Sequence, residues 1–357
     1  MMNVSHGEQR IERAVNLINR IFPFIILPLA TIGNSLCFLV FCRAKFQKRL
    51  TRTSSICLRL LCTNDLILLY LFIIDVLLKS NFNPPKRIYS SPETCRVYKF
   101  VRYSFLDMSA YLQLGLTTDR FICCVYRGYY SHWRKRFYIY YLLGTVFFVI
   151  LLKNSSFLSP FYGYSKDSKN QTVIKCSAVI EAKLFAKYMV YGQSLIDVIF
   201  ITCIPFFLIV YLNSRILTEV LRSRTKCYRT LTQLIHLAPC QVDNTIRNTT
   251  VILTQHRARH RRLHLTFALG CISFVFVLST APYKIFKVVE RHDKLIRDQY
   301  KHPLPKSVEI LLAEVIIESL EYASCSTPFF VCFLTSSLFR DELYRIFRRR
   351  DFSRNHY

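Results

Sequence analysis

Seven long apolar stretches follow one another along this chain, and they constrain its fold more than any other feature. A helix needs ~20 mostly apolar residues to cross the ~30 Å hydrocarbon core of a membrane, and each stretch is long enough. Helices satisfy their own backbone hydrogen bonds inside lipid, whereas open sheets do not. We therefore predict an all-α fold, a seven-transmembrane helix bundle. The predicted spans are 21–42, 56–78, 96–125, 137–161, 187–213, 264–289 and 308–334.

The chain is strongly basic, with a formal net charge of +27, yet 52% of its residues are hydrophobic. A soluble protein with such a charge would suggest nucleic-acid binding. Here Lys and Arg lie mostly between the apolar stretches, where they determine topology and contact anionic lipid headgroups. We therefore expect membrane lipids, and no nucleic acid, among its partners.

Sites for metals, cofactors or covalent catalysis are not visible in the sequence. Most of the 14 cysteines lie inside apolar stretches, and no Cys-x-x-Cys pair has a matching pair or a histidine cluster. The spans contain no His-rich metal set and no nucleophile–base spacing. We predict no metal site, no cofactor and no enzymatic activity.

The loops predict the orientation of the bundle. The first short loop, 43–52, is rich in Arg and Lys, as are the loop after 125 and the C-terminal tail, so these should be cytoplasmic. The N-terminus is then extracellular, and the sequons at Asn3 and Asn170 can be glycosylated there. Residues 1–20 do not resemble a signal peptide, so we expect the first span to act as signal and anchor.

This topology predicts a multi-pass protein of the plasma membrane with three parts. Its bundle should contain a flexible cytoplasmic loop, because the stretch after the fifth span is long, polar and basic. The parts are an extracellular tail (1–20), the bundle (21–336, with the flexible loop at about 223–256), and an amphipathic helix with a short cytoplasmic tail (337–357).

A short motif at the inner end of the third span carries a family resemblance. Asp119-Arg120-Phe121 is similar to the Asp-Arg-Tyr motif of the rhodopsin-like (class A) G-protein-coupled receptors, and Cys95 stands where that family has an outer cysteine. The joint order of the landmarks makes the resemblance specific, and it covers about residues 20–348. The other landmarks are Gly33-Asn34, Asp65, Pro205, Pro282, Thr327-Pro328 and a short eighth helix that begins at Phe339-Arg340.

The resemblance implies roles for several of these residues. It implies a disulfide between Cys95 and Cys176, and a switch for G-protein coupling whose hinges are the prolines of spans six and seven. It also implies that Asp65 is either a sodium site or a polar hub. These two alternatives stay open, because Ala323 and Thr327 replace polar groups that relatives supply. The expected switch residues are Asp119, Arg120, Phe121, Pro282, Thr327 and Pro328; the expected hub residues are Asn34, Asp65 and Ser109.

The chain departs from the family pattern at several switch positions. Ile150 stands in place of the span-four tryptophan, and Thr280 in place of the tryptophan before the span-six proline. Asn213 and Val331 replace tyrosines near the inner ends of spans five and seven. Arg262 lies where relatives often place an acid opposite the Asp-Arg-Tyr arginine. These replacements are compatible with raised basal signalling and also with a receptor that does not signal at all.

Charged residues at membrane depth define the expected ligand cavity. Arg102 stands where aminergic receptors have Asp, and span seven has no lysine to bind retinal, so we reject amine and opsin readings. Carboxylates inside a membrane should face a cavity and pair. Two readings stay open: an internal salt-bridge network, or a cavity for a basic ligand group. The cavity residues are Asp75, Arg102, Asp107, Asp197, Glu314, Glu318 and Glu321.

The resemblance implies a receptor for an extracellular ligand that activates a heterotrimeric G protein. Residues 205–216 resemble invertebrate neuropeptide receptors, notably the FMRFamide-receptor-like group, so a neuropeptide is the expected ligand. The alternative is a polytopic transporter or channel that uses the intramembrane carboxylates. The sequence has no visible internal repeat, which counts against a transporter.

Overall fold

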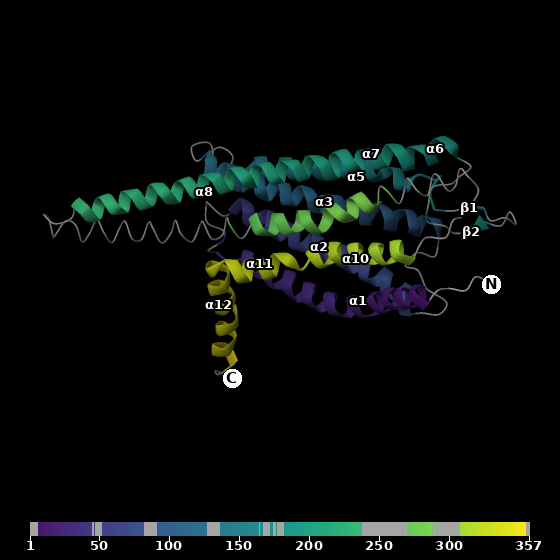
Figure 1. Ribbon diagram of the computed structural model, residues 1–357, viewed down its shortest axis with the longest axis horizontal. Coiled ribbons are helices and arrows are strands. Elements are labelled where there is room, and N and C mark those ends of the chain that lie inside the picture. Colours follow the sequence, from purple (N-terminus) through teal and green to yellow (C-terminus); the bar gives the residue numbers. More distant parts are fainter. Residues whose placement is uncertain are drawn as a thin grey trace.

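A computed structural model of the chain shows helical rods lying side by side, with a further helix leaving one end of the bundle at a steep angle (Figure 1). It describes residues 6–44, 46, 52–81, 91–126, 136–163, 165–166, 172–173, 176, 182–237, 267, 270–287, 289 and 308–354, and the statements below concern these residues. Asn3, Asn170 and Arg262 lie outside them.

Seven rods follow the order of the seven predicted spans. The fifth is one continuous rod in which α-helix alternates with two π-helical segments, and the seventh is broken in two. Residues 270–287 form the sixth rod. The fifth rod consists of α6 (Lys183–Lys187), η2 (Tyr188–Gly192), α7 (Gln193–Ile196), η3 (Asp197–Cys203) and α8 (Ile204–Leu237), and the seventh of α10 (Val308–Ser324) and α11 (Thr327–Thr335). The remaining labelled elements are α1 (His6–Phe41), α2 (Arg52–Asn81), α3 (Pro92–Val125), α5 (Arg136–Asn154), η1 (Ser155–Leu158), β1 (Ser165–Lys166), β2 (Thr172–Val173) and α12 (Ser337–Arg354).

Several helices run beyond the predicted spans. The first begins at His6, inside the predicted N-terminal tail. The fifth rod continues as α8 to Leu237, into the segment predicted as a flexible loop, and Figure 1 shows α8 projecting from the bundle. Apolar content marks the part of a helix that can lie in lipid, and a helix continues into water where its own hydrogen bonds persist. Strand structure in the described chain is the short antiparallel pair of β1 and β2.

Four of the described helices are long and apolar enough to cross a membrane by length and composition: Gln9–Phe41, Thr53–Leu77, Tyr140–Leu158 and Lys183–Arg222. The third rod is more polar because it carries charged residues that face the interior of the bundle. The seventh is interrupted between Ser324 and Thr327, and its α10 half has a carboxylate on several turns. Polar residues at these positions are expected of helices that line a bundle interior.

Glycine and aromatic residues bring the first and seventh rods together. A Cβ atom on Gly33 would lie 3.0 Å from the Cβ of Phe329, so a larger residue here would push α1 and α11 slightly apart. Phe339, the first landmark of the eighth helix, is fully buried and its ring lies 5.6 Å from that of Phe41. These contacts fix the start of α12 against the bundle.

A charged side chain caps the C-terminal end of the seventh rod. Arg340 donates hydrogen bonds of 2.9 Å to the carbonyl oxygens of Phe333 and Leu334, in the last turn of α11. A cation that caps these free carbonyls satisfies them and favours the negative end of the helix dipole. The buried Glu342 also pairs with Arg43, 3.6 Å away, which ties α12 to the segment after α1. The chain can therefore turn sharply into α12.

Candidate functional site

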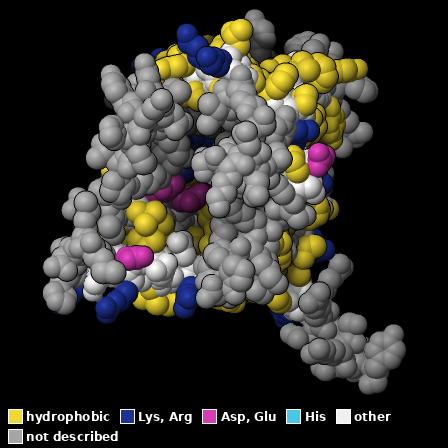
Figure 2. All heavy atoms as spheres, turned by 90° about the vertical axis from the view of Figure 1, so that its right-hand side faces the viewer, with side chains coloured by type: hydrophobic (Ala, Val, Ile, Leu, Met, Phe, Trp, Pro, Cys, Tyr) yellow, Lys and Arg dark blue, Asp and Glu magenta, His cyan; other side chains and the backbone are white. Residues whose placement is uncertain are grey.

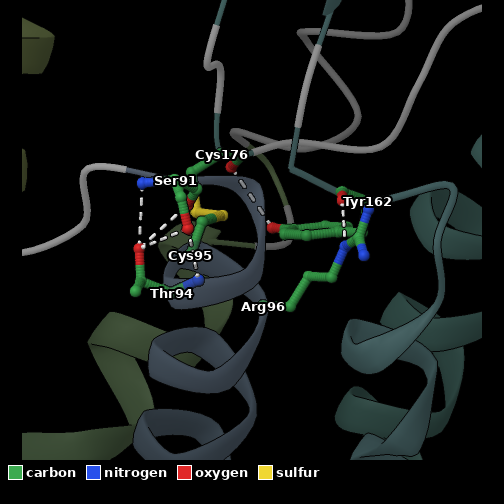
Figure 3. Close-up of a disulfide and its surroundings, with 6 residues drawn as sticks. All are labelled: Ser91, Thr94, Cys95, Arg96, Tyr162 and Cys176. Atoms are coloured by element: carbon green, nitrogen blue, oxygen red, sulfur yellow. Dashed lines mark hydrogen bonds between the residues drawn. A yellow bond between two sulfur atoms is a disulfide. The ribbon is translucent and has the colours of Figure 1, made fainter.

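A disulfide joins the start of α3 to the segment that follows β2, at the end of the bundle where α1 begins (Figures 1 and 3). Cys95 and Cys176, the pair that the resemblance implied, have Cα atoms 5.9 Å apart. Such a separation suits an unstrained bridge. Ser91 caps α3, since its hydroxyl accepts a 3.3 Å hydrogen bond from the Thr94 amide. The bridge therefore attaches to a well-defined helix start.

The segment after η1 is attached at the same end of α3. Arg96 of α3 donates hydrogen bonds to the carbonyl oxygens of Tyr162 (2.7 Å) and Pro160 (2.9 Å). The hydroxyl of Tyr162 in turn donates to the carbonyl of Cys176 at 3.3 Å (Figure 3). Gly163 follows with a φ of 108°, a conformation that favours glycine. These contacts hold three chain segments at the mouth of the bundle.

A cavity lies between the rods below this mouth. Viewed onto the same end of the molecule, acidic side chains are visible within a hollow (Figure 2). The cavity has apolar walls from α3, the fifth rod and the sixth rod, and a few polar groups project into it. Those polar residues include Asp65, Ser109, Gln113, Lys284, Glu321 and Ser324. The cavity has a volume of about 40 Å³, so in this arrangement it has room for a small group, such as a few waters or the end of one ligand side chain, and not for a whole ligand.

Arg102 is part of an ion pair across the bundle. Its guanidinium lies 3.2 Å from Glu318 of α10 and donates a 2.7 Å hydrogen bond to the hydroxyl of Tyr322. It also lies over the ring of Phe72, 5.5 Å from the ring centre. The side chain that replaces the aminergic aspartate is thus held by partners from α2 and α10.

A second charged cluster links four rods. Lys153 of α5 pairs with Asp107 of α3 at 2.6 Å and with Asp197 of the fifth rod. Asn154 donates to the same Asp107 oxygen at 3.0 Å, and Lys284 of the sixth rod lies 3.5 Å from the other. Asp107 is 1% exposed, so the positive side chains compensate a carboxylate removed from water.

The remaining predicted acids differ in their partners. Glu314 pairs with Lys287 at 2.7 Å. Asp75 is buried beside Tyr98 of α3. Glu321 is also buried, but neither of its carboxylate oxygens has a hydrogen-bond partner among the described residues. An internal salt-bridge network, one of the two alternatives that the sequence left open, therefore explains how Glu314 and Glu318 are neutralised, but not how Glu321 is.

The structure brings two of the three predicted hub residues together. Ser109 donates a 3.2 Å hydrogen bond to Asp65 and accepts one of 2.7 Å from Asn64. The amide nitrogen of Asn34 donates elsewhere, to the carbonyl of Cys325 at 2.8 Å. That carbonyl lies at the break between α10 and α11, just before Pro328, so a side chain from α1 can reach it. Asn34 thus secures the break in the seventh rod.

The Asp-Arg motif forms a buried cluster at the opposite end of the bundle. Arg120 pairs with Asp119 at 2.7 Å, and both side chains hydrogen-bond to the hydroxyl of Ser54 on α2. Asp119 is fully buried and Arg120 is 5% exposed. The ring of Phe121 instead packs on Tyr126, with ring centres 5.6 Å apart. The cluster ties the inner end of α3 to α2.

The predicted hinge residues lie on the sixth and seventh rods. Pro282 is inside the helix formed by 270–287, and Thr327 and Pro328 begin α11. Closer to the Arg120 end of the same helix, Ser273 contacts Thr117 of α3 through a 3.0 Å hydrogen bond between their hydroxyls. That bond connects the inner half of the sixth rod to α3 near the Arg120 cluster.

The sequence-based prediction missed several functional candidates. Three are lysines that neutralise predicted acids, and two are polar residues on α2. A lysine inside an apolar stretch was a signal, because an intramembrane charge needs a partner. The serine and asparagine had no such signal. The missed residues are Lys153, Lys284, Lys287, Ser54 and Asn64.

Comparison with known proteins identifies one family. The model of the family described as "7 transmembrane receptor (rhodopsin family)" matches residues 33–316, well over half of the chain. No curated protein matches the chain.

Proposed function

Because the chain belongs to the rhodopsin family of seven-transmembrane receptors, we propose that it senses an extracellular neuropeptide and passes the signal to a G protein. The family consists of G-protein-coupled receptors, which are multi-pass proteins of the plasma membrane and not enzymes. The family match therefore favours a receptor over a transporter or channel, the alternative that the intramembrane carboxylates had left open.

The charged cavity is the observation that supports a peptide ligand. The charged side chains of Asp65, Lys284 and Glu321 line the cavity. The Arg102–Glu318 ion pair lies between it and the Cys95–Cys176 bridge along α3. A peptide offers backbone groups and charged side chains that can exchange with such pairs. The short likeness of residues 205–216 to FMRFamide-receptor-like proteins points to a basic, amidated peptide.

The proposed signalling route runs from this cavity to the Arg120 cluster. A ligand that binds one arrangement of the rods better than another shifts the population toward it. We expect the inner end of the sixth rod to move outward about Pro282, breaking the Ser273–Thr117 contact. The space beside Arg120 would then admit a helix of the G protein. Arg222, Arg224, Arg257, Arg259 and Arg261 are candidate contacts from the loop between spans five and six.

In the proposed topology the N-terminus and the disulfide are extracellular, and α12 lies on the cytoplasmic side. Asn3 and Asn170 would carry glycans, and 1–20, 21–336 and 337–357 would be the tail, the bundle and the cytoplasmic end. Surface labelling of an N-terminal epitope without permeabilisation tests this orientation. An epitope that is accessible only after permeabilisation would reverse it.

A screen of amidated neuropeptides on cells expressing the chain tests the proposed function. Calcium and cyclic AMP should be read together, because the G-protein class is open. The expected result is a saturable response to at least one peptide that is absent from untransfected cells. Robust responses only to amines or lipids at equal surface expression would contradict the peptide assignment.

Removing the hydroxyl of Ser54 is expected to raise basal signalling. This hydroxyl holds Asp119 and Arg120 against α2, while the Asp119–Arg120 ion pair at 2.7 Å does not depend on it. Ser54→Ala should therefore fold and loosen the inactive arrangement, and basal GTPγS binding in membranes should rise several-fold. Ser55→Ala is the matched control, since the Ser55 hydroxyl donates to the carbonyl of Phe41 instead. Equal basal binding in Ser54→Ala and the unmodified chain would contradict this role.

A further inference from the structure

The cavity contains hydrogen-bond acceptors that have no donor. Both carboxylate oxygens of Glu321 and the side-chain oxygen of Gln113 are without a hydrogen-bond partner in the described part of the chain. Each side chain is only 2% exposed, and both line the same cavity. A buried acceptor left without a donor is costly, and for a carboxylate the cost is greater. These atoms therefore indicate a partner that the described residues do not supply.

The nearby cations of the described chain form ion pairs with other carboxylates, although Lys284 also acts on Glu321 through space. Lys284, which lines the same cavity, pairs with Asp107 at 3.5 Å. Arg102 and Lys287, one on α3 and one on the sixth rod, pair with Glu318 and Glu314 respectively. Glu318 and Glu314 thus each have a basic partner, whereas Glu321, the glutamate of α10 that lines the cavity, has no hydrogen-bond partner among the described residues.

The missing partner must be positively charged and rich in donors. A guanidinium has five N–H donors and no acceptor, and it binds a carboxylate through two parallel hydrogen bonds. It also stacks on aromatic rings, and Phe206 and Phe276 line this cavity. We infer that Glu321, with Gln113 beside it, binds the guanidinium group of an arginine-containing ligand. This inference rests on the proposed receptor function, because it takes this cavity as the ligand site.

Three other occupants would satisfy the same acceptors in part. Water could donate to them, but it does not neutralise a carboxylate in an apolar cavity. A proton on Glu321 removes the charge, yet the O–H it creates would also need an acceptor. Sodium would neutralise the charge, and it would be drawn toward Asp65, which lines the same cavity. Each of these occupants predicts a different response to added ligands.

Melting of the purified full-length chain distinguishes these cases without any signalling. The probes are the N-acetylated dipeptide Arg-Phe-amide, its neutral citrulline analogue (also N-acetylated), agmatine and sodium chloride, with choline chloride at equal ionic strength as the salt control. We expect the two guanidine compounds to raise the melting temperature and the citrulline analogue to have no effect. Loss of the charge-assisted pair in Glu321→Gln should weaken the apparent affinity by about tenfold or more.

Two further variants make the result specific to Glu321. Glu342→Gln is the matched control, because Glu342 is equally buried but pairs with Arg43 and Arg345 at the α12 end. It should respond to the probes as the unmodified chain does. Glu321→Asp keeps the carboxylate and should retain part of the response, which covers the case in which Glu321→Gln does not fold.

Several results would overturn the inference. They are equal stabilisation by the citrulline analogue, an unchanged affinity in Glu321→Gln, stabilisation by sodium alone, and no stabilisation by any guanidine compound. None of them bears on G-protein activation. A chain that binds guanidine compounds at Glu321 but fails to drive nucleotide exchange would instead contradict the proposed receptor function.

Discussion

Replacing Lys153 with methionine should lower the stability of the folded bundle by about 3–5 kcal/mol, the usual cost of removing one member of a buried ion pair. Lys153 lies 2.6 Å from Asp107 and also pairs with Asp197, and all three side chains are largely buried. After the substitution only Lys284, at 3.5 Å, remains to neutralise Asp107. Two neighbouring carboxylates would then lie at membrane depth with one fewer cation.

The measurement is the melting temperature of the purified chain in one detergent, together with surface expression. Lys287→Met is the matched control: its pair with Glu314 is more exposed, at 24% and 15% of the two side chains, so its loss should cost less. Adding Asp107→Asn and Asp197→Asn to Lys153→Met should restore much of the lost stability, because it removes the unpaired charges. A Lys153→Met protein as stable as the Lys287→Met protein would show that the cluster does not stabilise the bundle.

The order and approximate extent of the rods could be predicted well because membrane burial leaves a direct signal in the sequence. Each apolar stretch became one rod, and Pro328 lies beside the break that divides the seventh rod. The ends were predicted less well. The first helix begins at His6 and α8 continues to Leu237, since helical hydrogen bonding does not require apolar residues.

The candidate site could be predicted only in part. Intramembrane acids stand out in the sequence, and the rule that they must pair is general. The identity of each partner depends on how the rods are rotated and packed, which hydropathy does not encode. Asp107 and Lys153 are far apart in the chain and meet only because α3 lies against α5. Ser54 gives no sign of its role, because serine near the start of a helix is common for local reasons.

The family landmarks located the inner end of the site, and the structure shows where this chain differs. The Arg120 guanidinium contacts Asp119 and the hydroxyl of Ser54 at the inner ends of α2 and α3. Relatives often supply an acid from span six, where this chain has Arg262, outside the described residues. A hydroxyl is a weaker partner for a guanidinium than a carboxylate. The hydroxyl of Ser54 therefore contributes less to holding Arg120 than the carboxylate of Asp119 does.

Arg120→Gln should abolish G-protein activation, whatever the ligand. We propose that the Arg120 guanidinium leaves Ser54 and binds the G protein, and glutamine has neither the charge nor the forked donors for that contact. The Ser54→Ala receptor allows a test without a known agonist: its raised basal GTPγS binding should fall to the level of untransfected membranes when Arg120→Gln is added. Arg120→Lys should keep part of the activity, since it retains the charge. High GTPγS binding in the double variant at equal surface expression would refute this role of Arg120.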